Sequence, residues 1–121
     1  MKSEEKIYGK ELVLDLYHCR EEVLLSKEKI EEFLDKICSQ IKMKKYGKPI
    51  IERFGLAKDF TAGYSFVQLI ETSSITGHLS EFWKRAYINI FSCGDFDEEK
   101  AHQFAKKFFG AKKSKKRVLV R

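Results

Sequence analysis

Three strand patterns follow one another between residues 64 and 91, with very little chain between them. They cover Tyr64 to Glu71, Ser74 to Leu79 and Arg85 to Phe91. Connections this short join only antiparallel neighbours, because a parallel crossover needs about a dozen or more residues. The pattern therefore predicts a set of paired antiparallel strands, with a bend at Thr72 to Ser74.

Strand patterns also occur elsewhere in the chain. Lys10 to Tyr17 alternates, so that Leu12, Leu14 and Leu16 share one face of a strand. Further strands are predicted at Lys48 to Phe54 and Arg117 to Val120, with a loop from Gly55 to Gly63.

Two segments have the spacing of amphipathic helices. The first runs from Lys27 to about Lys42 and has Ser26 as its expected N-cap. Its apolar stripe consists of Ile30, Phe33, Leu34, Ile37 and Ile41. The second follows a cap at Asp95 or Asp97 and ends at Gly110. The order of helices and strands predicts a two-layer α+β sandwich, with both helices on one face of an antiparallel sheet.

The length of 121 residues fits one domain, residues 1–121, which can remove about two-thirds of its unfolded surface from water. Hydrophobic residues make up 43% of the chain, and ten phenylalanines can fill a core. No apolar run approaches the roughly 20 residues of a membrane span. Met1 to Lys6 is charged and has no apolar signal segment. We therefore expect a cytoplasmic protein without a membrane partner.

The cysteines and the net charge exclude several kinds of site. Cys19, Cys38 and Cys93 are odd in number and lack paired metal spacing, so neither a disulfide framework nor a metal site is predicted. Much of the net charge of +6 lies in Lys112 to Arg117, and such a run is usually solvated surface. The chain has no recognised nucleic-acid-binding motif, and we expect no nucleic-acid partner. A positive field also suits an anionic group such as a substrate carboxylate.

Four residues with chemically reactive side chains occur in this region. They are the candidate nucleophile Ser73, a second hydroxyl at Ser65, the imidazole of His78 and the thiol of Cys93. The stretch YSFVQLIETSSITGH, followed by IFSCGD, resembles the small prokaryotic S-adenosylmethionine decarboxylases. The offsets of the other three residues from Ser73 match the family pattern, as does the Cys-Gly-Asp run. The resemblance is dense from Gly63 to Asp95.

The resemblance implies a proenzyme that cuts its own chain between Thr72 and Ser73. The Ser73 hydroxyl attacks the Thr72 carbonyl to form an ester, which a turn between paired strands favours by straining that carbonyl. A base then removes the α-proton of Ser73, and β-elimination and hydrolysis leave a covalent pyruvoyl group. By resemblance, His78 is the processing base and Ser65 assists processing.

The same resemblance implies a decarboxylase without a metal. The ketone at residue 73 binds the substrate amine as a Schiff base and accepts the electrons released when carbon dioxide leaves. By resemblance, Cys93 returns a proton to the substrate carbon. A homodimer with two active sites near its interface is also implied, and a sheet covered on one face leaves its other face free for it.

The chain departs from the family where the substrate binds. After the processing histidine, the family carries a Thr-Trp-Pro-Glu type segment, and this chain reads Leu79-Ser80-Glu81-Phe82-Trp83. Thr72 stands where the family commonly has Glu, and Ser74 where it usually has His. The residues predicted to bind substrate are Glu71, Glu81, Phe60, Phe82 and Trp83.

Three functions remain open on these residues. S-adenosylmethionine is the substrate that the resemblance implies, and its decarboxylation supplies the aminopropyl donor for spermidine synthesis. Arginine or ornithine is the alternative substrate, because the altered segment lies where specificity is set. The third reading is an unprocessed, non-catalytic relative that acts as a binding or regulatory protein.

Overall fold

The computed structural model describes residues 6–121, so that most of the charged N-terminal segment lies outside the described residues. Its strands form one antiparallel sheet of six, in the order β2-β3-β4-β5-β1-β6. They are β1 (Lys10–Tyr17), β2 (Ile50–Phe54), β3 (Gly63–Ile70), β4 (Ser73–Ser80), β5 (Arg85–Ser92) and β6 (Lys113–Val120). The helices are α1 (Glu21–Leu24), α2 (Lys27–Gln40) and α3 (Glu98–Phe109), with a 3-10 turn, η1, at Asp59–Thr61.

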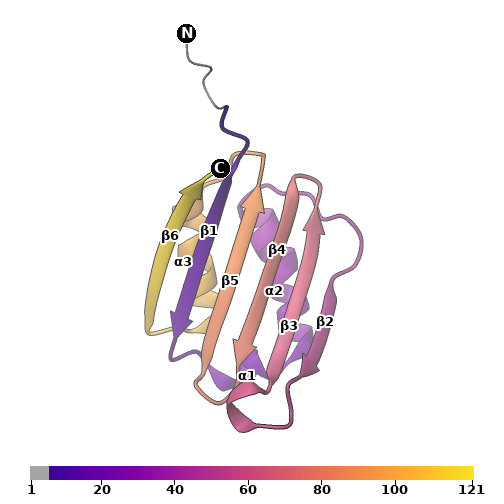
Figure 1. Ribbon diagram of the computed structural model, residues 1–121, viewed down its shortest axis with the longest axis vertical. Helices are drawn as coiled ribbons and strands as arrows, with labels where there is room; N and C mark the ends of the chain where they lie inside the picture. The colour runs from indigo at the N-terminus through magenta and orange to yellow at the C-terminus, as the bar shows by residue number, and fades with distance from the viewer. Residues whose placement is uncertain (1–5) are drawn as a thin grey trace.

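The two long helices, α2 and α3, lie behind the sheet in Figure 1, and the face toward the viewer is open. This arrangement confirms the predicted two-layer α+β sandwich. No helix among the described residues has the length and apolar character needed to cross a membrane. The short helix α1 was not predicted, because four residues are too few to show a helical period.

Both long helices begin at predicted caps. The Ser26 Oγ accepts a hydrogen bond from the Lys29 N–H at 3.1 Å, and the Asp97 Oδ1 accepts one from the Lys100 N–H at 2.9 Å. Helix α3 ends as predicted at Gly110, which has a left-handed φ of 62°. Helix α2 ends two residues earlier than predicted, at Gln40, because the chain turns at Lys42, whose φ is 58°.

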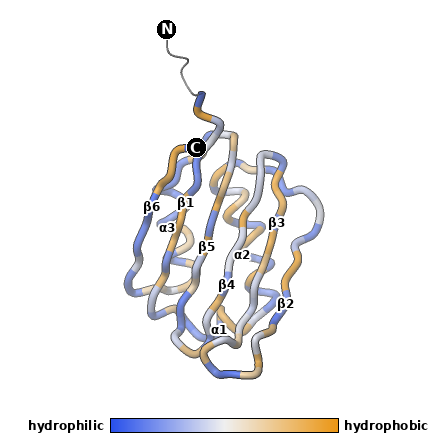
Figure 2. The backbone as a smooth tube through the Cα atoms, in the orientation of Figure 1, coloured by the Kyte–Doolittle hydropathy of each residue, from blue (hydrophilic) through white to orange (hydrophobic). Residues whose placement is uncertain are grey.

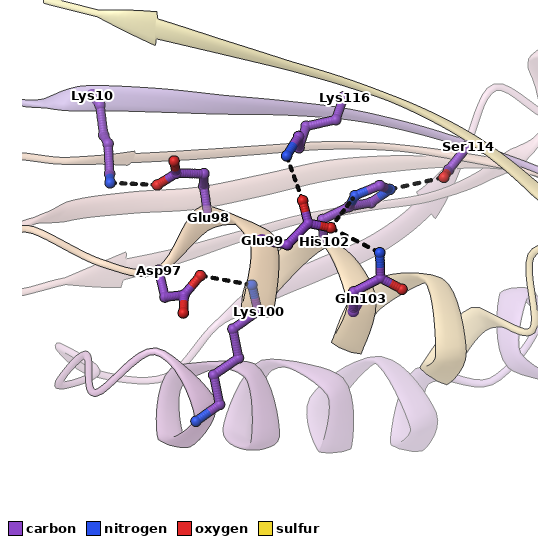
Figure 3. Close-up of polar contacts among 9 residues, drawn as sticks. All are labelled: Lys10, Asp97, Glu98, Glu99, Lys100, His102, Gln103, Ser114 and Lys116. Carbon is purple, nitrogen blue, oxygen red and sulfur yellow. Dashed lines mark hydrogen bonds and ion pairs between the residues drawn. The ribbon is translucent and has the colours of Figure 1, made fainter.

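Strand β6 begins at Lys113, four residues before the predicted closing strand. Figure 2 shows the reason: β6 is hydrophilic over most of its length and hydrophobic only near its C-terminal end. Polar contacts to α3 hold it instead, with Lys116 paired to Glu99 at 2.5 Å and Ser114 hydrogen-bonded to His102 at 2.8 Å (Figure 3). Hydrogen bonding to Gln103 and Lys116 lowers the pKa of Glu99 to about 2. The basic run is therefore a paired edge strand.

The hydrophobic core lies between the sheet and the two long helices. Phe33 of α2 is fully buried, and its ring lies 4.9–6.2 Å from four other phenylalanine rings. These rings belong to Phe66, Phe104, Phe108 and Phe109. The predicted apolar face of β1 is confirmed, because Leu12, Leu14 and Leu16 are all completely buried.

Gly77 of β4 makes room for the Phe66 ring. A Cβ added at Gly77 would lie 2.5 Å from Cε2 of that ring and closer still to Cζ. The two residues are direct partners across the β3–β4 pair, so the ring lies over the glycine. This close packing fixes the position of β4 against the core.

Gly77→Ala is expected to lower the free energy of unfolding by about 1–3 kcal/mol, because the ring must shift within a packed core. Urea denaturation measures the change. Ser74→Ala, on the open face of the same strand, is the control and should stay within about 0.5 kcal/mol of the wild type. Equal stability of Gly77→Ala and the control would contradict this account of the packing.

Candidate active site

The turn between β3 and β4 holds the predicted cleavage point. Ile70 pairs with Ser73, so Glu71 and Thr72 alone form the turn. The predicted bend at Thr72 to Ser74 is wrong by one residue, because the strand ladder continues down to Ser73. The φ of Ser73 is 159°, which is close to fully extended backbone. In Figure 1 this turn lies at the end of the sheet where β1 begins and β6 ends.

The carbonyl oxygen of Thr72 accepts a hydrogen bond from the backbone N–H of Cys93 at 3.0 Å. This is the carbonyl that the Ser73 hydroxyl is predicted to attack. A donor aimed at that oxygen stabilises the negative charge that develops on it during attack. The structure therefore brings Thr72, Ser73 and Cys93 together at one end of the sheet.

Two residues that the sequence analysis missed hold the Thr72 side chain. The buried Ser92 Oγ donates to the Thr72 Oγ1 at 2.7 Å and accepts from the Gly94 N–H at 3.0 Å. The Thr72 Oγ1 in turn lies 3.3 Å from the sulfur of Met43. A polar residue on the buried face of an otherwise apolar strand was the available signal, because Ala86, Ile88 and Ile90 share that face.

The three cysteines differ in their surroundings. Cys93 is exposed, whereas Cys19 and Cys38 are buried. Burial raises the pKa of the Cys19 thiol to about 12 and that of Cys38 to about 11. Cys93 also borders a hollow of about 330 Å³, formed by residues 7–10 and 93–95 together with Val120. Of the three thiols, Cys93 alone is placed to meet a substrate.

Ser65 and His78 form the second part of the predicted set. They are direct partners on β3 and β4, and the Ser65 Oγ lies 2.7 Å from the His78 Nδ1. Both side chains are on the open face, since their neighbours Phe66 and Leu79 are buried on the other. The hydroxyl orients the imidazole at this point of the face.

This pair does not lie beside Ser73 within one protomer. Ser73 and His78 are five residues apart on one strand, which corresponds to about 16 Å. Ser73 pairs with Ile70 and Ser92, both buried beneath the sheet, whereas His78 is on the open face. The four predicted site residues therefore lie in two places. Ser73 and Cys93 are at the end of the sheet, and Ser65 and His78 form a pair further along the strands.

The predicted substrate residues are divided in the same way. Glu71 lies in the turn two residues before Ser73, is exposed, and its carboxylate lies 3.8 Å from the Lys44 ammonium. Glu81 follows β4 at the opposite end of the sheet. Arg53 holds it with two hydrogen bonds, of 2.6 Å and 2.9 Å. Hydrogen bonding to Arg53 lowers the pKa of Glu81.

An aromatic cluster occupies the same end as Glu81. The Trp83 ring centroid lies 6.1 Å from that of Phe60 and 5.9 Å from that of Phe82. All three rings are about half exposed. They offer flat apolar surface to a ligand, at the end of β4 remote from Ser73. In the described part of the chain, no group of three or more His, Cys, Asp or Glu side chains is arranged to hold a metal ion.

Comparisons with known proteins agree with this fold. The crystal structure of the adenosylmethionine decarboxylase from Aquifex aeolicus VF5 superposes with a TM-score of 0.81 and is 22% identical, covering 97% of this chain and 92% of that chain. This likeness establishes the fold. No curated protein matches the chain. A family model described as S-adenosylmethionine decarboxylase matches residues 10–121. Since that match extends from the first residue of β1 to Arg121, the protein belongs to the S-adenosylmethionine decarboxylase family.

Proposed function

We propose that this chain cleaves itself between Thr72 and Ser73 and then decarboxylates S-adenosylmethionine. The family is one of pyruvoyl-dependent decarboxylases, whose product supplies the aminopropyl group of spermidine. The observation that carries the proposal for this chain is the Thr72 carbonyl. It lies in a two-residue turn, precedes a serine and accepts the Cys93 N–H at 3.0 Å.

Cleavage begins when the Ser73 hydroxyl attacks the Thr72 carbonyl carbon. The C–N bond of that peptide breaks and a C–O ester bond forms, while the Cys93 N–H stabilises the oxyanion. A base removes the α-proton of Ser73, and the Cβ–O bond then breaks, which frees Thr72 as a carboxylate. The remaining unsaturated residue takes up water and loses ammonia, which leaves the ketone.

The residues around Ser73 suit the group that this chemistry makes. The Ser73 position is half-buried, the Cys93 backbone N–H contacts the Thr72 carbonyl, and the exposed Cys93 borders the hollow. The pyruvoyl group supplies an electron sink that binds the substrate amine. Cys93 supplies the proton for the substrate carbon. The predicted processing base of the same protomer, His78, is about 16 Å from Ser73 along the strand.

We further propose that the base comes from a second copy of the chain. In the proposed dimer, the open sheet faces of two copies pack against each other. The two-fold axis lies between the two faces and is perpendicular to the strands. Such an axis reverses the strand direction, so the Ser73 end of one sheet comes to lie over the Ser80 end of the other. The partner's Ser65 and the partner's His78 then approach Ser73. The aromatic cluster and Glu81 of the same partner also come to that end.

The open face has the character of such an interface. Ile50, Val67 and Leu69 are side by side on β2 and β3, and Leu69 is 50% exposed. The sheet's six strands, about 4.8 Å apart and about 26 Å long, present roughly 700 Å². A standard interface buries about 800 Å² per partner. A second copy therefore fits this face in area and chemistry.

The contact between Arg53 and Glu81 bears on the substrate. A basic amino acid such as arginine needs an uncompensated carboxylate for its cationic end, and Arg53 already neutralises Glu81. The ribose hydroxyls of S-adenosylmethionine are neutral donors that a carboxylate still accepts, because it has about four lone-pair sites. Phe60, Phe82 and Trp83 offer a face for its purine. This favours S-adenosylmethionine over arginine or ornithine.

We also propose a cytoplasmic location. All three cysteines are free, and the proposed chemistry needs Cys93 as a thiol. Exposed thiols persist in compartments that glutathione and thioredoxin keep reduced.

Self-cleavage should yield fragments 1–72 and 73–121, the second with a blocked N-terminus, whereas Ser73→Ala stays intact. Ser92→Ala should cleave about tenfold more slowly, because it releases the Thr72 side chain from its 2.7 Å hydrogen bond. Intact-mass spectrometry over time measures both. A wild-type chain that stays whole after prolonged warming would contradict the proposed enzyme. It would favour the alternative, an unprocessed binding or regulatory protein.

The shared site is testable by mixing two inactive variants. Ser73→Ala and His78→Ala should each fail to cleave alone. Refolded together, they should form heterodimers in which the His78→Ala chain is cut, because its Ser73 meets the partner's His78. Mass spectrometry identifies the chain that is cut. The control is Ser73→Ala mixed with the double variant Ser73→Ala/His78→Ala, which should stay whole. No cleavage in the first mixture would place the base within one protomer.

Carbon dioxide release from S-adenosylmethionine should exceed that from arginine and ornithine. Cys93→Ala should cleave normally but release carbon dioxide at least about tenfold more slowly, because it lacks the proton donor. Radiometric assays of the three substrates side by side measure this. Turnover of arginine with none of S-adenosylmethionine would reverse the substrate assignment, and normal turnover by Cys93→Ala would remove that residue from the mechanism.

A further inference from the structure

The helix layer carries a groove that the proposed active site does not use. It has a volume of about 640 Å³ and is lined by side chains of α1, α2 and α3, together with Arg20, the residue before α1. Pockets of about 300–1,000 Å³ are typical of sites for small organic ligands. None of the described residues that line it belongs to a strand. The groove is therefore separate from the open face of the sheet and from the turn before Ser73.

Positive charge is concentrated in this groove. Five cationic side chains line it, against the two carboxylates of Glu22 and Glu32, so the groove carries +3 of the chain's net charge of +6. The cations are Arg20, Lys29, Lys36, Lys100 and Lys107. A cleft lined mainly by one sign of charge focuses the electric field and concentrates ions of the opposite sign. The groove therefore favours an anionic ligand.

The helical repeat places the four lysines on the groove. Lys29 and Lys36 are two turns apart on α2, and Lys100 and Lys107 are two turns apart on α3. The members of each pair therefore share a face of their helix and are about 10.5 Å apart along its axis. Figure 3 shows the Lys100 side chain extending from α3 toward α2. Each helix thus presents positive charge at two positions along the groove.

The carboxylates compensate only part of this charge. Glu32 lies 3.4 Å from the Lys29 ammonium and 2.6 Å from that of Lys36, so one carboxylate serves both lysines of α2. The ion pairs within residues 6–121 include neither Lys100 nor Lys107. The two lysines that α3 contributes are therefore available to an anion.

Two aromatic rings line the same groove. The ring centroids of Phe104 and Phe108 are 5.8 Å apart, and both rings pack on Phe33, at 6.1 Å and 5.5 Å. Both side chains remain half-buried, so part of each ring faces the groove. Nucleic-acid bases stack on exposed aromatic rings of this kind, whereas an inorganic anion gains nothing from them. The groove therefore combines a surface for a flat base with cations for phosphates.

We propose that this groove binds a nucleoside polyphosphate. The phosphates lie between the lysines of α2 and α3, because ammonium groups form charge-assisted hydrogen bonds with phosphate oxygens. The base lies against Phe104 and Phe108. S-adenosylmethionine has the same kind of base but carries a positive sulfonium, which a positively charged groove repels. The groove and the proposed active site therefore select different adenosyl ligands.

The first test measures binding to the uncleaved Ser73→Ala chain by isothermal titration calorimetry at low salt and without divalent metal. ATP should bind about tenfold more tightly than inorganic tripolyphosphate, because only ATP has a base to stack. Saturating S-adenosylmethionine should leave the affinity for ATP within about twofold. Displacement of ATP by S-adenosylmethionine would place ATP in the proposed substrate site and overturn the proposal. Absence of ATP binding, or equal affinity for the two phosphates, would overturn it as well.

The second test places the ligand in the groove. Lys100→Gln/Lys107→Gln should weaken binding of ATP and of tripolyphosphate about tenfold, because both lose their phosphate contacts on α3. Lys112→Gln/Lys113→Gln is the matched control, since it removes the same charge from exposed positions outside the groove, and should bind within about twofold of the parent. Phe104→Leu should weaken binding of ATP about fivefold and spare tripolyphosphate. Equal losses in the two lysine pairs, or unchanged ATP binding by Phe104→Leu, would overturn the site.

Discussion

The register of the β3–β4–β5 ladder is the constraint on which the rest of this structure depends. It sets Ser65 opposite His78, places Gly77 under Phe66 and brings the end of β5 against the β3–β4 turn. A slip of one residue would move every side chain of a strand to the other face. The Phe33 cluster prevents that slip, because it needs the apolar face inward. Core packing therefore positions the site as well as stabilising the fold.

The layout of the sheet separates the residues predicted to act together. The proposed nucleophile and the proposed proton donor are at the end of the sheet, where the turn meets the Cys93 backbone. The imidazole lies further along the same strand, on the face that the described elements leave open. One straight strand cannot bring its own residues 73 and 78 together. The proposed two-fold pairing of open faces would bring the partner's His78 to Ser73 without bending the strand, and would cover Val67 and Leu69.

The surroundings of the site divide into the proposed cleavage point and the segment predicted to bind substrate. Around the scissile bond, Thr72 and Ser92 are connected by a short polar network that suits a self-cleaving turn. The segment from Glu81 to Trp83 has the residue types for an adenosyl ligand, but Arg53 already engages its carboxylate. The segment predicted to set specificity is thus where the sequence departs from the family pattern.

The sequence by itself determined the elements whose signals are local. The alternating leucines of β1 and the apolar stripe of α2 follow from the spacing of apolar residues within one segment. The caps Ser26 and Asp97 follow from hydrogen bonding at the helix ends. The spacing around Ser73 also identified the family. Tertiary structure alone decided the extent of β6, whose hydrophilic residues are held by α3 and β1, and the contacts of Ser92. It also decided that Ser73 and His78 lie apart, because spacing along a chain becomes a distance only once the strand between them is known to be straight.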